Sequence, residues 1–266
     1  MTPEKKKTGK KPAPKKMIQS IQRASDILSL FITEKNPLGI TEFAQRLKLP
    51  KTTIQGIVQT LAELNYLERD SLSSKYRLGP MLFQLGIKYA TNLDFVDITR
   101  GWMERLCSQY REPVNLGMLV GERVVLVLRV EPDNRFMVFP QVGSVIPTHS
   151  SAIGKMLLAF LEPDRREAVL RNCPFEAYTP NTITTRERFE QELDEARKNN
   201  VSFDREENII GLSGIGAPIR NHTGQVIAAF ALTGDTERIE SSRKEIIGTV
   251  RDISRVISSR MGWGEE

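Results

Sequence analysis

Cysteine and histidine are scarce in this chain, which limits the kinds of site that it can build. Its 266 residues include two cysteines, Cys107 and Cys173, and two histidines, His149 and His222. None of the four lies at the close spacing of metal ligands, so we expect no structural zinc site. Two isolated cysteines also fit a reducing compartment, and we expect a cytoplasmic protein.

Long apolar runs are missing as well. No stretch approaches the roughly 20 apolar residues that a membrane-spanning helix needs. The N-terminal lysines are not followed by the apolar segment of a secretory signal, so we expect no membrane association. Hydrophobic residues make up 39% of the chain and charged residues 27%, as in an ordinary globular protein. The length allows two domains, each with its own core.

The net charge is unevenly distributed along the chain. Residues 1–16 hold seven Lys and one Glu, whereas the remainder is nearly balanced, with 31 basic and 32 acidic side chains. The Lys-rich tail has almost no apolar residues and is therefore expected to be disordered. Two interpretations of it stay open: a nonspecific phosphate-binding arm, or a solvated tail with no dedicated partner.

The most informative segment is ITEFAQRLKLPKTTIQGIVQTLAEL, residues 40–64. Its apolar residues recur at helical spacing in two runs separated by Pro50, which predicts two short helices joined by a tight turn. The second helix has an opposite face of polar side chains that can hydrogen-bond base edges and phosphates. We predict that this face binds DNA through Lys51, Thr52, Thr53, Gln55 and Gln59.

The flanking segments indicate a winged helix-turn-helix. An amphipathic helix is expected over residues 18–32, and Thr41 is predicted to cap the next helix and to lie at the DNA surface. Beyond the second helix, two short runs flank the polar stretch 70–74, which predicts a hairpin wing. Lys75 and Arg77 on this wing are available to phosphates. Double-stranded DNA is therefore the expected partner.

The pattern changes after residue 80. Helical periodicity predicts helices over 80–92, 96–110, 151–161, 186–199 and 238–261. Between them, β-rich runs predict strands over 114–120, 123–130, 136–142, 213–219 and 225–233. Antiparallel strands with helices at both ends of the segment predict an α+β sheet domain.

Six segments, in this order, resemble those of IclR-type transcriptional regulators: IQRASDILSLF, ITEFAQRLKLPKTTIQGIVQTL, YRLGPMLFQLG, IPTHSSAIGKMLLAFL, VSFDREENIIGLSGIGAPIRN and GQVIAAFALTG. The resemblance covers about residues 17–262. It implies an α+β protein in which an N-terminal winged helix-turn-helix is joined by a helical linker to a GAF-like antiparallel-sheet effector domain. The expected domains are a disordered tail (1–16), a DNA-binding domain (17–79), a linker helix (80–95) and an effector-binding domain (96–262).

The resemblance also implies an effector pocket in the C-terminal domain. The positions that match the family's pocket are Ala152, Ile153, Asp204, Gly214, Ala231 and Thr233. Family members that bind small oxoacids tend to have Cys at the position of Gly214 and Ser at that of Ala231. Because those hydrogen-bonding groups are missing here, we expect a larger or more apolar organic effector, held at Asp204 and Thr233 and packed near Ile153.

Other departures from the family pattern concern single residues. Asn200 replaces a usual Gly, and Asn tolerates positive φ nearly as well. Arg220 replaces an aromatic residue or His; of two alternatives, a side chain that reaches the pocket or one that faces solvent, we expect the second. Gln55-Gly56 replaces the common His-Arg on the recognition helix, which removes a cation near the DNA.

Several motifs that suggest catalysis fail on spacing or context. Gly154-Lys155 resembles the end of a P-loop, but the Gly required five residues earlier is His149. His149 has no nucleophile defined beside it, and Ser150 and Ser151 are expected to cap a helix. Gly211, Gly214 and Gly216 do not have the spacing of a dinucleotide-binding fingerprint; we expect them to let the backbone turn and approach a ligand.

The sequence therefore predicts a ligand-responsive DNA-binding regulator without catalysis or a cofactor. The resemblance implies a homo-oligomer, either a dimer or a dimer of dimers. One alternative is a DNA-binding protein whose C-terminal domain only oligomerises. A second is an enzyme that uses Asp204, Glu206 or Glu207 as acid or base, although no nucleophile, metal or cofactor loop accompanies them.

Overall fold

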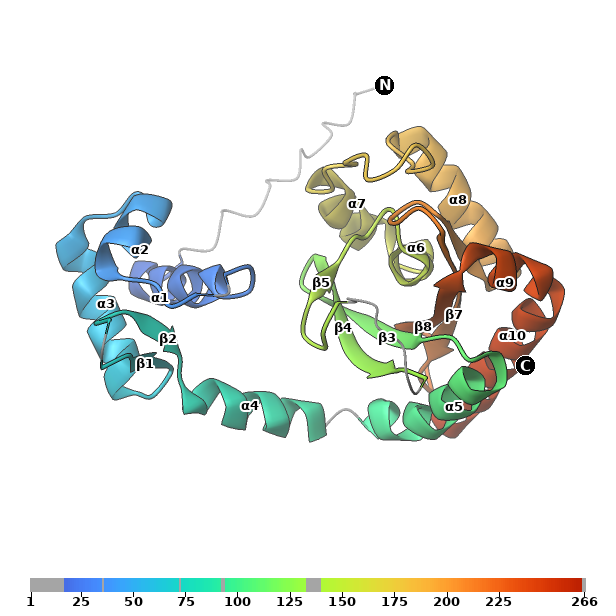
Figure 1. Ribbon diagram of the computed structural model, residues 1–266, viewed down its shortest axis with the longest axis horizontal. Helices are drawn as coiled ribbons and strands as arrows, with labels where there is room; N and C mark the ends of the chain where they lie inside the picture. The colour runs from blue at the N-terminus through green and yellow to red at the C-terminus, as the bar shows by residue number, and fades with distance from the viewer. Residues whose placement is uncertain (1–16, 35, 72, 92–93, 133–139, 265–266) are drawn as a thin grey trace, which may run out of the picture. The chain divides into compact units, whose positions relative to one another are not determined.

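The computed structural model describes residues 17–34, 36–71, 73–91, 94–132 and 140–264 (Figure 1). The chain forms two compact units, Met1–Thr91 and Asn92–Glu266. The division falls inside the segment 80–95 that the sequence suggests as a linker. No helix within the described ranges is long and apolar enough to cross a membrane.

The N-terminal unit contains the predicted winged helix-turn-helix. Helices α1 (Gln19–Leu30), α2 (Ile40–Leu47) and α3 (Lys51–Glu63) are followed by strands β1 (Leu67–Arg69) and β2 (Tyr76–Leu78), which pair antiparallel. Each helix contributes fully buried side chains to one core, among them Ile27, Phe43 and Ile54. Leu67 and Tyr76 extend this core into the wing, so the hairpin is fixed to the helices.

Helix α2 begins differently from the prediction. Gly39, not Thr41, is its N-cap, and the Gly39 N–H donates to the Glu42 carboxylate over 2.5 Å. A carboxylate in the first turn satisfies a backbone donor that has no partner inside the helix. The prediction that Thr41 caps α2 is therefore wrong, and Thr41 is an exposed residue of its first turn.

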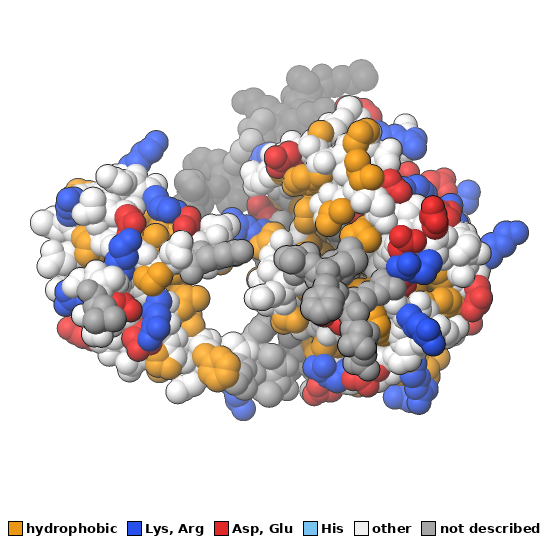
Figure 2. Space-filling model, in the orientation of Figure 1, with side chains coloured by type: hydrophobic (Ala, Val, Ile, Leu, Met, Phe, Trp, Pro, Cys, Tyr) orange, Lys and Arg blue, Asp and Glu red, His pale blue; other side chains and the backbone are white. Residues whose placement is uncertain are grey.

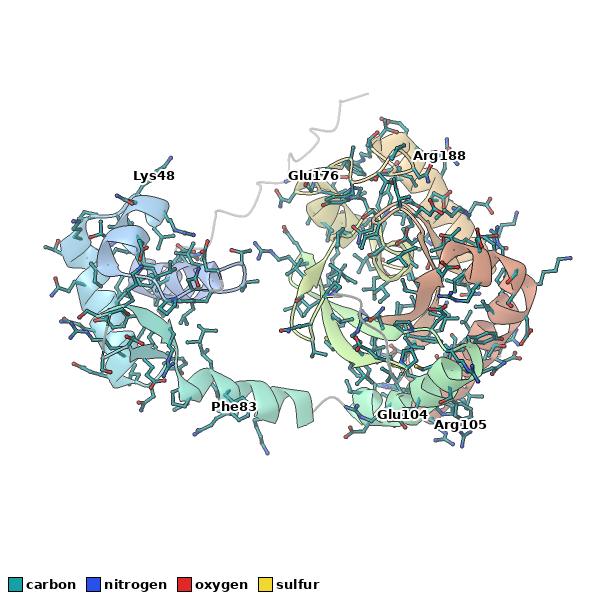
Figure 3. All side chains as sticks on the ribbon, viewed as in Figure 1. Lys48, Phe83, Glu104, Arg105, Glu176 and Arg188 are labelled. Carbon is teal, nitrogen blue, oxygen red and sulfur yellow. The ribbon has the colours of Figure 1, made fainter. Side chains whose placement is uncertain are left out.

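Helix α4 (Pro80–Thr91) follows the wing almost directly. Gly79 makes this possible, because a Cβ at that position would overlap the backbone carbonyl of Asn65. The helix exposes large apolar side chains, with Phe83 70% and Leu85 49% exposed. Phe83 points away from the helix into solvent (Figure 3).

The C-terminal unit is built on an antiparallel sheet, as predicted. In the described residues its strand order is β5-β4-β3-β8-β7-β6. The strands are β3 (Val114–Val120), β4 (Arg123–Val130), β5 (Val145–Ile146), β6 (Ser202–Arg205), β7 (Leu212–Arg220) and β8 (Val226–Asp235).

Helices cover both faces of this sheet, and the strand period of two divides the side chains between two cores. On β8, Phe230 and Leu232 join the core under α5 (Asp94–Tyr110) and α10 (Arg243–Arg260). Ala229 and Ala231 face the opposite core, under α6 (Ala152–Ala159), α7 (Pro163–Arg171) and α8 (Arg186–Asn199). Figure 1 shows the sheet between these two layers.

Two predicted elements differ in the structure. The strand expected at 136–142 falls mostly on residues 133–139, outside the described residues, and 140–142 form no strand. The single helix expected at 238–261 is divided into α9 (Thr236–Ser241) and α10. The Asp235 side chain caps α9, and Ile239 fixes this short helix to the core before the chain turns at Ser242.

Candidate functional site

The polar face of α3 is open to solvent. Lys51, Thr52, Gln55 and Gln59 are exposed and Thr53 is half-buried, while Ile54 and Val58 on the opposite face are fully buried. Packing of the apolar face therefore fixes the helix, while the amide and hydroxyl groups of the polar face stay accessible to solvent. This arrangement is the one that base-edge contacts in a groove require.

The start of α3 adds an electrostatic feature. Lys51 occupies its first turn, where the helix dipole makes a cation unfavourable. Lys48 lies in the turn between α2 and α3, in the left-handed conformation with φ of +53°, and its side chain points outward (Figure 3). A phosphate near this turn would meet both ammonium groups and the N-terminal end of α3.

The wing cations predicted to contact phosphates have acidic neighbours. Lys75 pairs with Glu42 at 3.0 Å, and Arg77 binds Glu68 through two hydrogen bonds of 3.2 and 3.3 Å. All four side chains are well exposed, and exposed pairs of this kind contribute only about 0–1 kcal/mol. They are weak enough for a phosphate to replace the carboxylates.

Gly56 leaves a gap on the same face of α3. It is exposed, and a Cβ built there would meet no atom within 4 Å. Packing therefore does not require glycine in this helix, although Gly costs about 1 kcal/mol relative to Ala. A position without a side chain lets the helix backbone approach a ligand closely.

In the C-terminal unit, a cavity opens between α6 and the sheet. Residues of neighbouring strands on the face toward α6 form two rows across the sheet. Register places Arg129, Asn115, Ala231 and Gly216 in one row, and Thr233, Gly214 and Asp204 in the next. The space is about 630 Å³ when its open mouth is counted.

Most of the predicted effector residues line this cavity. Ala152, Ile153, Asp204, Ala231 and Thr233 do so. Gly214 lies between two of them, since a Cβ there would be 3.2 Å from Thr233 Oγ1 and 3.6 Å from Asp204 Cβ. The remaining walls are mainly apolar, from Leu126, Pro140, Ile146, Pro147, Ile209 and Leu212, with Ser151 and Asn208.

Arg129 and Asn115 are cavity residues that sequence reasoning missed. Arg129 is 8% exposed; its Nη1 donates to Asn115 Oδ1 over 3.1 Å, and its Nε donates to the Glu131 carboxylate. Strand periodicity gave no signal, because Val124 and Leu126 face α6 whereas Leu128 joins the opposite core, and a register shift beside Leu126 brings Arg129 to the face of α6. A guanidinium held this way in an apolar cavity is suited to binding a carboxylate.

Asp204 lies at the other row of the cavity beside a buried ion pair. Burial raises its pKa to about 7, and the nearby Glu207 charge adds to this, while the Glu207 N–H donates to Asp204 Oδ1 over 2.8 Å. Glu207 itself pairs with Lys155 of α6, and Lys155 Nζ also donates to the Phe203 carbonyl over 2.9 Å. Near neutral pH, Asp204 can therefore donate or accept a hydrogen bond.

The segment HSSAIGK, residues 149–155, supports the cavity by its structure. Ser151 caps α6 by accepting from the Gly154 N–H over 3.1 Å, as predicted, whereas Ser150 is buried and does not cap the helix. A Cβ at Gly154 would overlap the Thr148 backbone, and Lys155 is fully buried. The glycine and lysine of this motif thus fix α6 against the loop and the sheet.

Two single-residue predictions can be compared with the structure. Asn200 at the end of α8 has φ of +51°, so it adopts the positive φ that Asn is expected to tolerate. The expectation that Arg220 faces solvent is wrong. Its guanidinium lies 4.3 Å from the Phe160 ring and 5.4 Å from the Trp263 ring, and donates to Asn200 Oδ1 over 2.8 Å. Burial among these groups lowers the pKa of Arg220.

Comparison with known proteins relates both units to regulators of transcription. The family model described as the IclR helix-turn-helix domain matches residues 20–71, and the model described as Bacterial transcriptional regulator IclR C-terminal matches 87–259. The glycerol operon regulatory protein of Streptomyces coelicolor is 33% identical over 251 residues, covering 93% of this chain and 98% of its own. The regulator XynR of Escherichia coli is 30% identical, covering 85% and 90%.

Solved structures agree with this relationship. An IclR regulator from a Silicibacter species superposes with a TM-score of 0.83 at 22% identity, covering 93% of this chain and 98% of its own. An IclR homologue from Microbacterium hydrocarbonoxydans, solved in complex with 4-hydroxybenzoate, has a TM-score of 0.77 at 25% identity, covering 91% and 98%. These relatives are regulators, so the interpretation of Asp204, Glu206 or Glu207 as catalytic groups is set aside.

Proposed function

Because the chain belongs to the IclR family of bacterial transcriptional regulators, we propose that it binds an operator through α3 and its wing, and that a small organic effector in the C-terminal cavity changes this binding. The proposal of DNA binding is supported by α3, which exposes amide and hydroxyl groups on one face while its apolar face is fully buried. The proposal of effector binding is supported by the cavity that Arg129 and Asp204 line.

On the operator, α3 would enter the major groove. Gln55 and Gln59 carry amides that suit the N6 and N7 atoms of adenine, whereas Lys51 suits a phosphate. Thr41, Thr52 and Thr53 would add contacts from the neighbouring first turns of α2 and α3. Lys75 and Arg77 would exchange their carboxylate partners for backbone phosphates as the wing lies along the duplex.

The protein would act as a homo-oligomer. Four large apolar side chains are between 49% and 70% exposed, and an isolated subunit would leave them in water: Ile18 and Ile21 in the N-terminal segment, and Phe83 and Leu85 on α4. Figure 2 shows apolar side chains at the surface of the N-terminal unit. A two-fold related pair of subunits would read two half-sites of one operator.

The cavity favours an organic acid with an apolar or aromatic body. Arg129 and Asn115 would hold the carboxylate at one row of the sheet, and Asp204 and Thr233 would hold a hydroxyl or second polar group at the next row. Ile153, Leu126 and Ile146 would pack against the body between them. The 4-hydroxybenzoate in the Microbacterium homologue has this combination of groups.

DNA binding is tested by selecting duplexes from a random-sequence pool with the full-length protein. We expect enrichment of a site with two related halves, bound with an affinity that falls steeply with salt. Failure to enrich any sequence above the nonspecific background would contradict operator binding. The selected duplex then serves for titrations with candidate effectors.

Effector binding is tested by isothermal calorimetry with hydroxybenzoates, compared with pyruvate and glyoxylate as small oxoacids. We expect the aromatic acids to bind more tightly and to change the affinity for the selected duplex by about 5- to 150-fold, the usual range for allosteric coupling. Replacing Arg129 with Met should weaken ligand binding by about 10- to 100-fold through the loss of charge-assisted hydrogen bonds. Arg123→Met, at an exposed position on the same strand, is the matched control.

The alternative, a C-terminal unit that only oligomerises, predicts a different result. Gly214 and Ala231 bring no polar group to the cavity, which is compatible with that role. In that case an added acid would raise the melting temperature of the wild type by no more than it raises that of the Arg129→Met variant. A true effector stabilises the folded state by mass action.

A further inference from the structure

The C-terminal unit brings a cysteine and a histidine together outside the effector cavity. Cys173 Sγ lies 3.7 Å from His149 Nδ1, although 24 residues separate them in the sequence. Helix α7 and the turn that follows it return the chain to the segment before α6. The expectation that His149 has no nucleophile beside it is therefore wrong.

The surroundings of His149 define which nitrogen is the base. Its Nε2 lies 2.9 Å from the backbone carbonyl oxygen of Glu176, which can only accept a hydrogen bond, so Nε2 carries the proton. The lone pair of Nδ1 then faces the thiol. Phe175 and Tyr178 hold the imidazole ring from two sides, with centroid distances of 5.5 and 5.6 Å. His149 is 1% exposed, so its orientation is fixed.

Cys173 is a half-buried thiol with a proton acceptor in place. Burial raises the pKa of the Cys173 thiol, so the resting side chain is neutral and donates to His149 Nδ1. A neutral thiol is protected from indiscriminate reaction, because the thiolate is the nucleophile. Transfer of its proton to His149 generates that thiolate when an electrophile is bound.

A second cavity gives access to this pair. Its walls are apolar or aromatic at Val169, Pro174 and the Tyr178 ring, and polar at Glu122, Arg123 and Asn172. Walls that combine apolar and aromatic surface with hydrogen-bonding side chains suit an organic molecule that has both a hydrocarbon part and a polar group such as a carbonyl. His149 and Cys173 both line the cavity.

The other cysteine restricts the chemistry. Cys107 is 3% exposed in the core under α5 and α10, on the opposite face of the sheet from the helices that surround Cys173. The two sulfurs cannot meet without unfolding the unit, so a disulfide within the chain is excluded. Addition of an electrophile needs no second thiol.

We propose that Cys173, with His149 as its base, is a covalent modification site for α,β-unsaturated carbonyl compounds. The thiol proton passes to His149 Nδ1 as the sulfur bonds to the β-carbon. The π electrons of the C=C bond move onto the carbonyl to form an enolate. The imidazolium then returns the proton to the α-carbon, which completes the addition without an oxidant or reductant.

An adduct at this site would act on the effector cavity. Ile146 and Pro147 line both cavities, so the same short segment forms a wall of each. Pro147 also accepts from Ser151, the cap of α6, over 2.5 Å. Displacing this wall would change the shape of the effector cavity, and this consequence depends on the proposed function of that cavity.

The reaction is tested with N-ethylmaleimide, an unsaturated dicarbonyl, on the native full-length protein followed by peptide mass spectrometry. We expect one adduct, on Cys173, while Cys107 stays unmodified and so reports that the fold is intact. Replacing His149 with Gln should slow the addition by about 100-fold, as the loss of a general base does. Equal rates in wild type and His149→Gln, or no adduct on native Cys173, would overturn the proposal.

The consequence for regulation is measured with the selected duplex. Modified wild type should bind it with an affinity at least about 5-fold different from the unmodified protein, whereas treated Cys173→Ser should not change. An adduct that leaves the affinity unaltered would overturn the coupling to the effector cavity. Loss of the proposed function itself would be distinguished by failure of the unmodified protein to bind DNA.

Discussion

The two units of the chain differ in where they place the charges around their candidate sites. In the N-terminal unit the pairs Arg46–Glu34, Lys75–Glu42 and Arg77–Glu68 lie at the surface. In the C-terminal unit the pair Lys155–Glu207 is at most 2% exposed, and Arg129 is nearly as buried. Surface pairs can be exchanged for phosphates at little cost, whereas buried charges keep a fixed position. A surface that binds a polyanion needs the first property, and a cavity that selects a small molecule needs the second.

The largest expected effect tests the buried side of this comparison. Lys155→Met should lower the free energy of unfolding of the C-terminal unit by about 3–5 kcal/mol, because Glu207 would be left as an uncompensated buried charge. Both tryptophans, Trp102 and Trp263, lie in this unit, so urea unfolding followed by their fluorescence reports it selectively.

Two further variants make this measurement decisive. Lys198→Met, at an exposed position on α8, should change the stability by less than about 0.5 kcal/mol. Lys155→Met combined with Glu207→Leu should recover much of the loss, since no charge is then left unpaired. If the single Lys155 variant behaves like the Lys198 control, the buried pair does not have the assigned role.

The second prediction concerns Asp204 and pH. Its folded-state pKa, about 7, lies above the ordinary value of 3.8, so the folded protein holds this proton more tightly than the unfolded chain. The stabilisation is complete below about pH 4 and is lost as the pH rises to about 7. It amounts to at most about 4 kcal/mol. The actual value is smaller, because the Asp204 side chain is partly exposed to solvent.

Asp204→Asn removes this dependence while keeping an oxygen that can accept from Glu207. Between pH 4.5 and 7.5, the variant should therefore become progressively more stable relative to wild type in the same fluorescence assay. Parallel stability curves for the two proteins would show that Asp204 does not titrate in this range.

The third prediction tests the exposed side. Lys51→Ala should weaken operator binding for all sequences alike and reduce the slope of log affinity against log salt by about 1. Its stability should be unchanged or slightly higher, because the helix dipole disfavours a cation in the first turn of α3. Gel shifts over a salt series measure the slope; a slope identical to that of wild type would remove Lys51 from the DNA contacts.

The smallest expected effect is at Gly56. Gly56→Ala should raise the stability of the N-terminal unit by up to about 1 kcal/mol, since the added methyl group meets no atom within 4 Å. Far-ultraviolet circular dichroism during urea unfolding measures it. If the α3 backbone approaches the duplex here, the stabilised variant should also bind the operator less well; unchanged affinity would show that the gap is not used.

The difference between the units also explains what the sequence could predict. The surface proposed to bind DNA is local: a buried face of Ile54 and Val58 implies that Gln55 and Gln59 are exposed, as they are in the structure. The cavity depends on strand register, which places Asn115 between Arg129 and Ala231. Periodicity along one strand contains no information about its neighbours.

For the same reason, the cavity residues that were predicted came from family resemblance, and Arg129 was missed. Residue type favours Thr41 as a cap, because Thr is common at that position, but the Glu42 carboxylate accepts from the Gly39 N–H and the helix begins earlier, at Ile40. The contacts of Arg220 with Phe160 and Trp263 depend on tertiary packing, which the sequence around Arg220 does not show.

The claim that α3 reads the operator is tested most directly by repeating the random-sequence selection with Gln59→Ala. The account predicts a site that has lost its preference at one or two positions in each half while the rest of the sequence is retained, with a cost of about 1–3 kcal/mol on the original duplex. Selection of the same site with the same affinity would contradict it.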